Sequence, residues 1–182
     1  ETTQSVYSYL GENYGFADQQ AFLGYQSYII NEGDDDFGKY VSNALYNNLD
    51  QNLDIFRTGN HFKHSINLGF SVNNHLFTGI NINMHELLFE ETKTFEEFGY
   101  ANNSNVQRVF LKEDLIAFGT GFSFQVGSII KIKQLRVGLS YSTPTILNIE
   151  EETSQIIETD IIKKDGLTTY NIDPNTINIY EE

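Results

Sequence analysis

Lys63 and Arg136 are the residues of this sequence whose type and setting best suit the binding of an anionic group. Each lies at a polar position in a stretch that alternates between apolar and polar residues. Alternate side chains of a strand share a face, so each cation would lie among small and amide side chains. Arg offers a two-pronged match to a carboxylate, whereas Lys offers a point charge. The candidate ligand-binding residues are Lys63, Asn67, Asn81, Asn83 and Arg136.

Other residues that could support catalysis or metal binding occur without the required spacing. His61 and His64 are three positions apart, so on a strand they face opposite sides and cannot share a metal. The acidic run at residues 34–36 lacks the spaced ligands of a calcium loop. The glycines at residues 119 and 121 do not continue into a phosphate-binding glycine loop. We therefore expect no enzyme, no metal site and no cofactor.

The composition favours strands and argues against several classes of function. The chain has 182 residues, a formal net charge of −14, 14% aromatic residues and no cysteine. Aromatic residues are enriched in strands, and a nucleic-acid-binding domain would carry a basic patch instead of this acidic balance. No apolar run approaches the roughly 20 residues of a membrane-spanning helix. Membrane β-barrels remain possible, because their strands need only about 10 alternating residues.

Within residues 61–143, apolar and polar residues alternate with a period of two. This pattern predicts four antiparallel strands that form two hairpins. We expect the turns at residues 73–75 and 129–134, and no helix in 115–127. The apolar positions of the four strands include Phe62, Ile66, Leu68, Phe70, Val72, Ile80, Ile82, Met84, Phe118, Phe122, Phe124, Val126, Leu135, Val137, Leu139 and Tyr141.

The polar positions of these strands are small and mostly uncharged. The third strand, for example, places Ala117, Gly119, Gly121 and Ser123 opposite its aromatic residues. Glycine weakens a strand unless something approaches it closely. The pattern therefore predicts an all-β membrane barrel, with the apolar face toward lipid and the small face toward the lumen. A soluble sandwich or a lipocalin-like barrel is the alternative.

The rest of the chain is predicted to form loops outside the barrel. Residues 1–60 are irregular and partly helical, with a helix capped by Asp18 and a second amphipathic segment at 40–53. Residues 61–182 hold the antiparallel strands, with long polar loops at 89–112 and 145–170. Short turns at one end and long loops at the other are typical of outer-membrane barrels.

Two segments resemble a known family. Asn67-Leu-Gly-Phe-Ser-Val-Asn-Asn-His-Leu-Phe-Thr-Gly-Ile-Asn-Ile82 is similar to a hairpin of the FadL-type outer-membrane transport family. A second and more specific likeness runs from Gly119-Thr-Gly-Phe-Ser-Phe-Gln-Val-Gly to Leu135-Arg-Val-Gly-Leu-Ser-Tyr-Ser-Thr-Pro-Thr145. The resemblance covers roughly residues 17–160 and points to a Bacteroidota-like branch of the family.

The resemblance implies a 14-stranded barrel with short helices in its extracellular loops and a plugging N-terminal hatch. Four clear strands cannot close such a barrel, and the hatch motif Asn-Pro-Ala is missing, so the chain looks like a middle section. The implied function is passive uptake of hydrophobic small molecules, such as long-chain fatty acids, through the bacterial outer membrane. The implied surroundings are the lipid bilayer and lipopolysaccharide, without nucleic acid.

Two other functions stay open. A FadL-like barrel that does not transport could bind a partner protein, as secretion shuttles do, and a soluble barrel could bind a ligand. The role of Arg136 is open as well, because it could pair with an acidic hatch residue or lie at the membrane interface.

Overall fold

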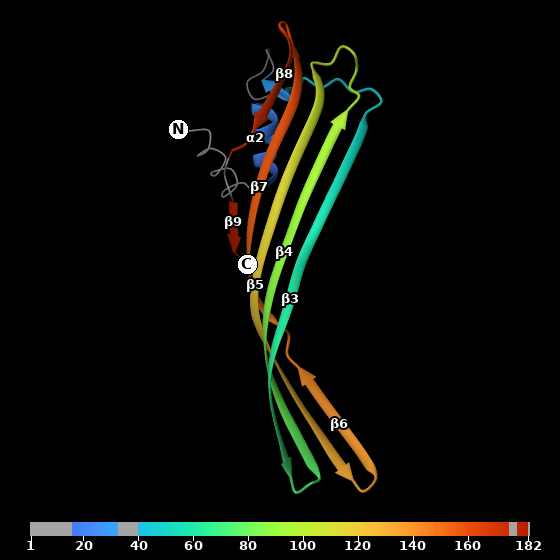
Figure 1. The fold of residues 1–182 in the computed structure, drawn as a ribbon, viewed down its shortest axis with the longest axis vertical. Helices are drawn as coiled ribbons and strands as arrows, with labels where there is room; N and C mark the ends of the chain where they lie inside the picture. Colours follow the sequence, from blue (N-terminus) through green and yellow to red (C-terminus); the bar gives the residue numbers. More distant parts are fainter. Residues whose placement is uncertain (1–15, 33–39, 175–177, 182) are drawn as a thin grey trace. The chain divides into compact units, whose positions relative to one another are not determined.

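The computed structural model describes residues 16–32, 40–174 and 178–181 (Figure 1). Strands dominate the described residues, and α2 is their one helix. The elements are α2 (Phe16–Gln26), β1 (Ile30–Glu32), β2 (Tyr40–Ser42), β3 (Asp50–Val72), β4 (Leu76–Phe98), β5 (Val106–Ile132), β6 (Leu135–Ser142), β7 (Ile146–Lys163), β8 (Gly166–Ile172) and β9 (Asn178–Glu181). Among these residues, no helix has the length and apolar character needed to span a membrane.

Seven of the strands form one sheet in the order β3-β4-β5-β7-β8, with β6 beside β5 and β9 beside β7. β6 and β7 pair with β5 one after the other, and the break between them contains Pro144. Pro174 lies in the corresponding break between β8 and β9, which both pair with β7. Proline has no N–H to donate to a ladder, which suits these interruptions. The remaining strands, β1 and β2, form a separate antiparallel pair.

The two predicted hairpins are present. Asn73 and Asn74 have φ angles of 51° and 56°, and the N–H of His75 donates to the carbonyl of Val72. Consecutive positive φ angles match the right-handed twist of a hairpin, and Asn tolerates them. The second turn is shorter than predicted, because Ile132 pairs directly with Leu135 and leaves only two residues between the strands. The expectation of no helix in 115–127 is confirmed, since this range lies within β5.

The predicted long loops at 89–112 and 145–170 are wrong. β4 continues to Phe98 and β5 begins at Val106, while residues 146–172 are mostly the hairpin of β7 and β8. Acidic clusters suggested loops, yet these residues lie on strands, and several of them pair with cations on neighbouring strands. Arg108, for instance, bonds Glu96 of β4 and Glu158 of β7, each at 2.6 Å. Such cross-strand pairs stabilise a sheet instead of ending it.

The prediction for residues 1–60, of which 1–15 and 33–39 lie outside the described residues, is correct only in part. The helix exists, but it begins at Phe16, so Asp18 lies inside it and not at its cap. The second predicted helix, at 40–53, is absent, because this segment holds β2 and the start of β3. Its apolar spacing fitted a helix, yet pairing of β2 with β1 decides the backbone, as tertiary context often does. The strand region therefore begins at Asp50, ten residues before the predicted boundary at 60.

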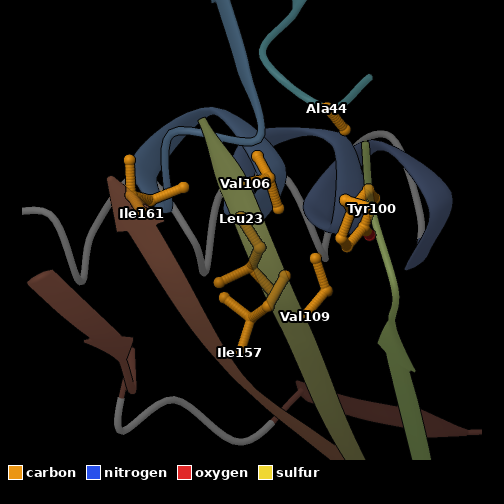
Figure 2. Packing of buried hydrophobic residues seen from close by; sticks show 7 residues of the cluster. All are labelled: Leu23, Ala44, Tyr100, Val106, Val109, Ile157 and Ile161. Carbon is orange, nitrogen blue, oxygen red and sulfur yellow. The ribbon is translucent and has the colours of Figure 1, made fainter. Parts of the chain in front are cut away.

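The chain divides into two compact units. The helix-bearing unit comprises Glu1–Arg57, Glu90–Leu115 and Glu152–Ile179, as far as these are described. Its core forms where α2 meets β5 and β7, around the fully buried Leu23 (Figure 2). The buried cluster consists of Leu23, Ala44, Tyr100, Val106, Val109, Ile157 and Ile161.

The hairpin unit comprises Thr58–Phe89, Ile116–Glu151 and the described part of Tyr180–Glu182. Its large apolar side chains are exposed instead of buried, and Leu139 reaches 81% exposure. β3 is exposed along its whole length on both faces. The exposed apolar side chains of this unit include Phe62, Ile66, Leu68, Phe70, Ile80, Ile82, Met84, Phe118, Phe122, Phe124, Val126, Val137, Leu139 and Tyr141.

Candidate functional site

A groove lies on the small face of the hairpin unit. It has a volume of about 730 Å³ and an open mouth. Phe77 and Ile129 provide apolar walls, and the amides of Asn81 and Gln125 lie at its polar end. The residues of this small face that line the groove are Gly69, Ser71, Phe77, Gly79, Asn81, Gln125, Gly127, Ile129, Gly138 and Ser140. We call it the glycine groove.

The glycines of the groove are not required by contacts within the sheet. A Cβ added to Gly127 would lie 3.6 Å from its nearest neighbours, which is ordinary van der Waals contact. Gly121 is different, because a Cβ there would lie 2.3 Å from the carbonyl oxygen of Ile146. Packing therefore explains Gly121 but not Gly127. The absent side chains at Gly69, Gly79, Gly127 and Gly138 leave room above the strands for another molecule.

Of the five predicted ligand-binding residues, only Asn81 lines the glycine groove. Its Nδ2 donates to Oε1 of Gln125 at 3.2 Å. Lys63 and Asn67 are exposed on β3, and Arg136 is exposed on β6. Asn83 is buried, with 3% exposure, and its amide is engaged within the sheet. The structure thus brings Asn81 and Asn83 close along β4 but does not gather all five around one point.

A hydrogen-bonded row across β3, β4 and β5 was not predicted from the sequence. The hydroxyl of Ser65 donates to Oδ1 of Asn83 at 2.7 Å, and Nδ2 of Asn83 donates to Ser123 at 3.3 Å. Ser123 also bonds Nε2 of His85, whose Nδ1 faces His61 at 3.1 Å. The sequence does not reveal that His61 meets His85, because this contact depends on the register of β3 against β4.

Lys131 is a cation that sequence reasoning missed. It pairs directly with Arg136 across β5 and β6, so both side chains lie on the small face. Residues 129–134 were expected to be a turn, which removed Lys131 from the strand pattern. Lys131 therefore joins Lys63 and Arg136 among the cations of this face.

The buried face of β5 differs in polarity between the two units. In β5 the buried Val109 is odd-numbered, whereas the even-numbered Arg108 carries ion pairs. In the hairpin unit the even-numbered Phe122 is exposed, whereas the odd-numbered Ser123 is buried. The buried odd-numbered positions of β5 are thus small in the hairpin unit but include the apolar Val109 in the helix-bearing unit, where the even-numbered Val106 is buried as well.

Charge pairing shifts two ionisable groups of the helix-bearing unit. Hydrogen bonds to Glu96 and Glu158 raise the pKa of Arg108. A hydrogen bond from Arg57 lowers the pKa of Glu91, and the nearby Lys93 adds to this effect. Both groups therefore stay charged, and they link neighbouring strands of this unit.

Comparison with known proteins adds no relative. No family model matches the chain, and no curated protein matches it. Within residues 16–32, 40–174 and 178–181, no three His, Cys, Asp or Glu side chains gather as metal ligands would. The glycine groove and the exposed apolar face are therefore the features on which a function must be argued.

Proposed function

We propose that this chain is a section of a β-barrel of the bacterial outer membrane that lets hydrophobic small molecules, such as long-chain fatty acids, cross passively. The exposed apolar face of the hairpin unit carries the proposal. Soluble proteins rarely expose contiguous apolar patches beyond a few hundred Å². Here large apolar side chains are exposed on β3, β4, β5 and β6 alike. Lipid is the solvent that such a face fits.

The distribution of charge supports the same reading. Residues 64–72, 76–85, 116–130 and 137–149 contain no Asp, Glu, Lys or Arg. A barrel strand crosses the hydrocarbon layer in about 9–11 residues. The two charge-free stretches of the first hairpin have this length. A bilayer excludes unpaired charges, whereas the face of a soluble sheet normally carries them.

The buried face of β5 is small at Ser123 but apolar at Val109, which fits a strand that continues from lipid into water. Within a bilayer the large apolar side chains face outward to lipid. In water they must be covered, as α2 covers Val109 and Ile157 in the helix-bearing unit. The acidic residues of that unit would then face solvent outside the membrane. A soluble ligand-binding barrel gives no reason for such a change.

The glycine groove supports passage of a small molecule along the small face. Its walls are apolar at Phe77 and Ile129, and its polar groups are uncharged amides and hydroxyls. Ligand sites commonly combine an apolar lining with a few polar groups that fix orientation. A FadL-like barrel that only binds a partner protein would share the lipid face but would not need this space.

Site-directed spin labels test the lipid-facing assignment. The full protein would carry a nitroxide at Phe122 or at Ser123, neighbours on β5 with opposite faces. In reconstituted vesicles, collisions with lipid-soluble oxygen should be more frequent at Phe122. More frequent collisions with oxygen at Ser123 would show that the lipid-facing and lumen-facing sides are exchanged. The absence of collisions at both positions would contradict insertion of the hairpin unit in the bilayer.

Uptake by whole cells tests the transport step. Gly127→Leu fills the glycine groove, whereas Thr120→Leu adds the same side chain at an exposed position on the other face of β5. At matched surface expression, fatty-acid uptake should fall with Gly127→Leu and stay unchanged with Thr120→Leu. Normal uptake in both variants would favour the protein-binding barrel.

A further inference from the structure

Cations continue the small face of β5 and β6 beyond the end of the glycine groove. Ile129 and Gly138 line the groove and lie directly opposite each other in the register of the two strands. Lys131 and Arg136 form the next pair on the same face, about 7 Å further along each strand. Lys133 lies in the turn between the strands, with a φ of 53°. All three cations are exposed, and we call them the basic turn.

The basic turn has no acidic partner among the residues that the structure describes. No ion pair found there includes Lys131, Lys133 or Arg136. The strands around the turn, residues 58–85 and 116–149, contain no Asp or Glu. Like charges placed directly opposite each other on neighbouring strands destabilise a sheet. In a chain with a net charge of −14, these cations therefore suit an anion that comes from outside the sheet.

The polarity of the small face changes in steps along β5. From Gln125 to Lys131, the positions on this face are an amide, a glycine, an apolar side chain and a cation. Phe77 of β4 adds a second apolar wall and remains exposed although it lies on the small face. The groove volume of about 730 Å³ lies within the roughly 300–1,000 Å³ that is typical of small-molecule sites. A ligand that matches these steps has an apolar chain next to an anionic group.

The number of cations distinguishes between anionic groups. A phosphate monoester carries about −1.5 to −2 charges near pH 7 and offers three acceptor oxygens, whereas a carboxylate carries a single charge on two oxygens. Lys131 and Arg136 lie on two strands, and Lys133 adds a third positive charge at the turn. Arg can bind an oxyanion through two parallel N–H groups, and Lys acts as a point charge. Three cations without a counter-charge therefore fit a phosphate better than a carboxylate.

We propose that the glycine groove and the basic turn together bind a single-chain amphiphile with a phosphate monoester head. This inference rests on the proposed passage of small molecules along the groove, and it names their chemical class. The apolar chain lies over Gly127, beside Phe77 and Ile129, and the phosphate lies at Lys131 and Arg136. The small face is the lumen side of the proposed barrel, so the molecule meets this site during passage and not from the surrounding lipid.

Isothermal titration calorimetry of the full protein in a neutral detergent tests the phosphate site. The probes are octyl phosphate, octanoate and octanol, which have equal chain lengths. We expect octyl phosphate to bind most tightly, and the combined change Lys131→Gln and Arg136→Gln to weaken it roughly ten-fold or more, toward the affinity of octanol. Lys164→Gln is the matched control, because Lys164 is an exposed cation in the turn between β7 and β8, and it should leave binding unchanged.

Filling the groove tests the position of the apolar chain. Gly127→Leu should weaken octyl phosphate several-fold, whereas Thr120→Leu, at an exposed position on the other face of β5, should not. Binding of inorganic phosphate, which needs only the basic turn, should persist in Gly127→Leu and shows that this variant is folded.

Three results would overturn the proposal. Equal affinities for octyl phosphate and octanoate would remove the preference for phosphate. Undiminished octyl phosphate binding after loss of Lys131 and Arg136 would exclude the basic turn, and undiminished binding in Gly127→Leu would exclude the groove. Because binding is measured in detergent, its failure leaves the oxygen collisions at Phe122 unaffected. Loss of those collisions with intact binding would instead contradict only the membrane barrel.

Discussion

Nε2 of His61 lies 3.1 Å from Nδ1 of His85, and the two stacked rings have centroids 5.3 Å apart. One nitrogen must donate and the other must accept. If Ser123 donates to Nε2 of His85, then Nδ1–H of His85 donates to His61, and the amide of Asn83 donates to Ser123. This assignment gives each group a partner and joins three strands. The proton positions are inferred from the network.

Loss of the His85 side chain should weaken the hairpin unit. His85→Ala removes the partner of the exposed His61 and one of the two partners of the buried Ser123, which should cost about 0.5–1.5 kcal/mol of unfolding free energy. Urea unfolding of the reconstituted protein measures this cost. His64→Ala is the control, because His64 is exposed and its nearest acidic group, on Glu86, is 3.9 Å away. An equal loss in both variants would show that the buried network contributes little.

Two glycines of β5 should respond differently to the same small change. Gly121→Ala places a Cβ 2.3 Å from the carbonyl oxygen of Ile146, so the strands must shift and stability should fall. Gly127→Ala meets nothing closer than 3.6 Å and should leave stability almost unchanged. The urea midpoints of the two variants decide this, and a larger loss for Gly127→Ala would contradict the described approach of β7.

Leu23 should anchor α2 to the sheet of the helix-bearing unit. It is fully buried among Val106, Val109, Ile157 and Ile161 (Figure 2). Leu23→Ala should cost about 2–5 kcal/mol, because it removes buried methyl groups and leaves a cavity. Limited proteolysis of the helix and urea unfolding give the readouts. Ala21→Ser, at an exposed position of the same helix, is the control and should behave as the unaltered protein.

The ion pair of Arg57 and Glu91 should make stability depend on pH in acid. The hydrogen bond from Arg57 lowers the pKa of Glu91 from its usual 4.5, so the unfolded chain binds this proton more readily than the folded one. The contribution of Glu91 is therefore present above pH 4.5 and is lost as pH falls through the lowered pKa. Arg57→Gln should reduce this acid dependence of the urea midpoint, and Arg57→Lys should retain much of it. An unaltered acid profile in Arg57→Gln would show that the pair does not contribute.

Lys63 should matter only for substrates that carry a carboxylate. A charge-assisted contact of about 1.5–3 kcal/mol corresponds to roughly ten-fold or more in binding. Lys63→Ala should therefore reduce uptake of a long-chain fatty acid but not of an uncharged hydrocarbon, at matched surface expression. Equal uptake of the fatty acid in both proteins would remove the carboxylate role from Lys63.

The sequence predicted the hairpin unit well because its pattern is strict. Aromatic and aliphatic residues alternate with small ones on both sides of Asn73 and Asn74, so strands and turn follow from local rules. The same approach failed at residues 89–112. There apolar residues occur at both even and odd positions, such as Val106 and Val109, and charges form pairs with residues far along the chain, such as Arg108 with Glu158.

The sequence predicted the face on which single residues of the candidate site lie, but not which residues contact each other. Alternation placed Asn81 and Asn83 on the small face, but the register decides which of them meets Gln125 and which is enclosed by Ser65 and Ser123. The stacking of His61 on His85 likewise depends on pairing across strands. These hydrogen bonds and ring contacts depend on which residues of neighbouring strands lie opposite each other. The periodicity of a single strand does not give this register.

The order of the seven-stranded sheet has a consequence for how the chain folds. The hairpins β3-β4, β5-β6 and β7-β8 join strands that follow each other in the chain, whereas β5 must also pair with the more distant β7. Pairing over short separations costs little loop entropy and proceeds faster than pairing between remote strands. The sheet can therefore grow in chain order, each completed strand offering its free edge as the template for the next one.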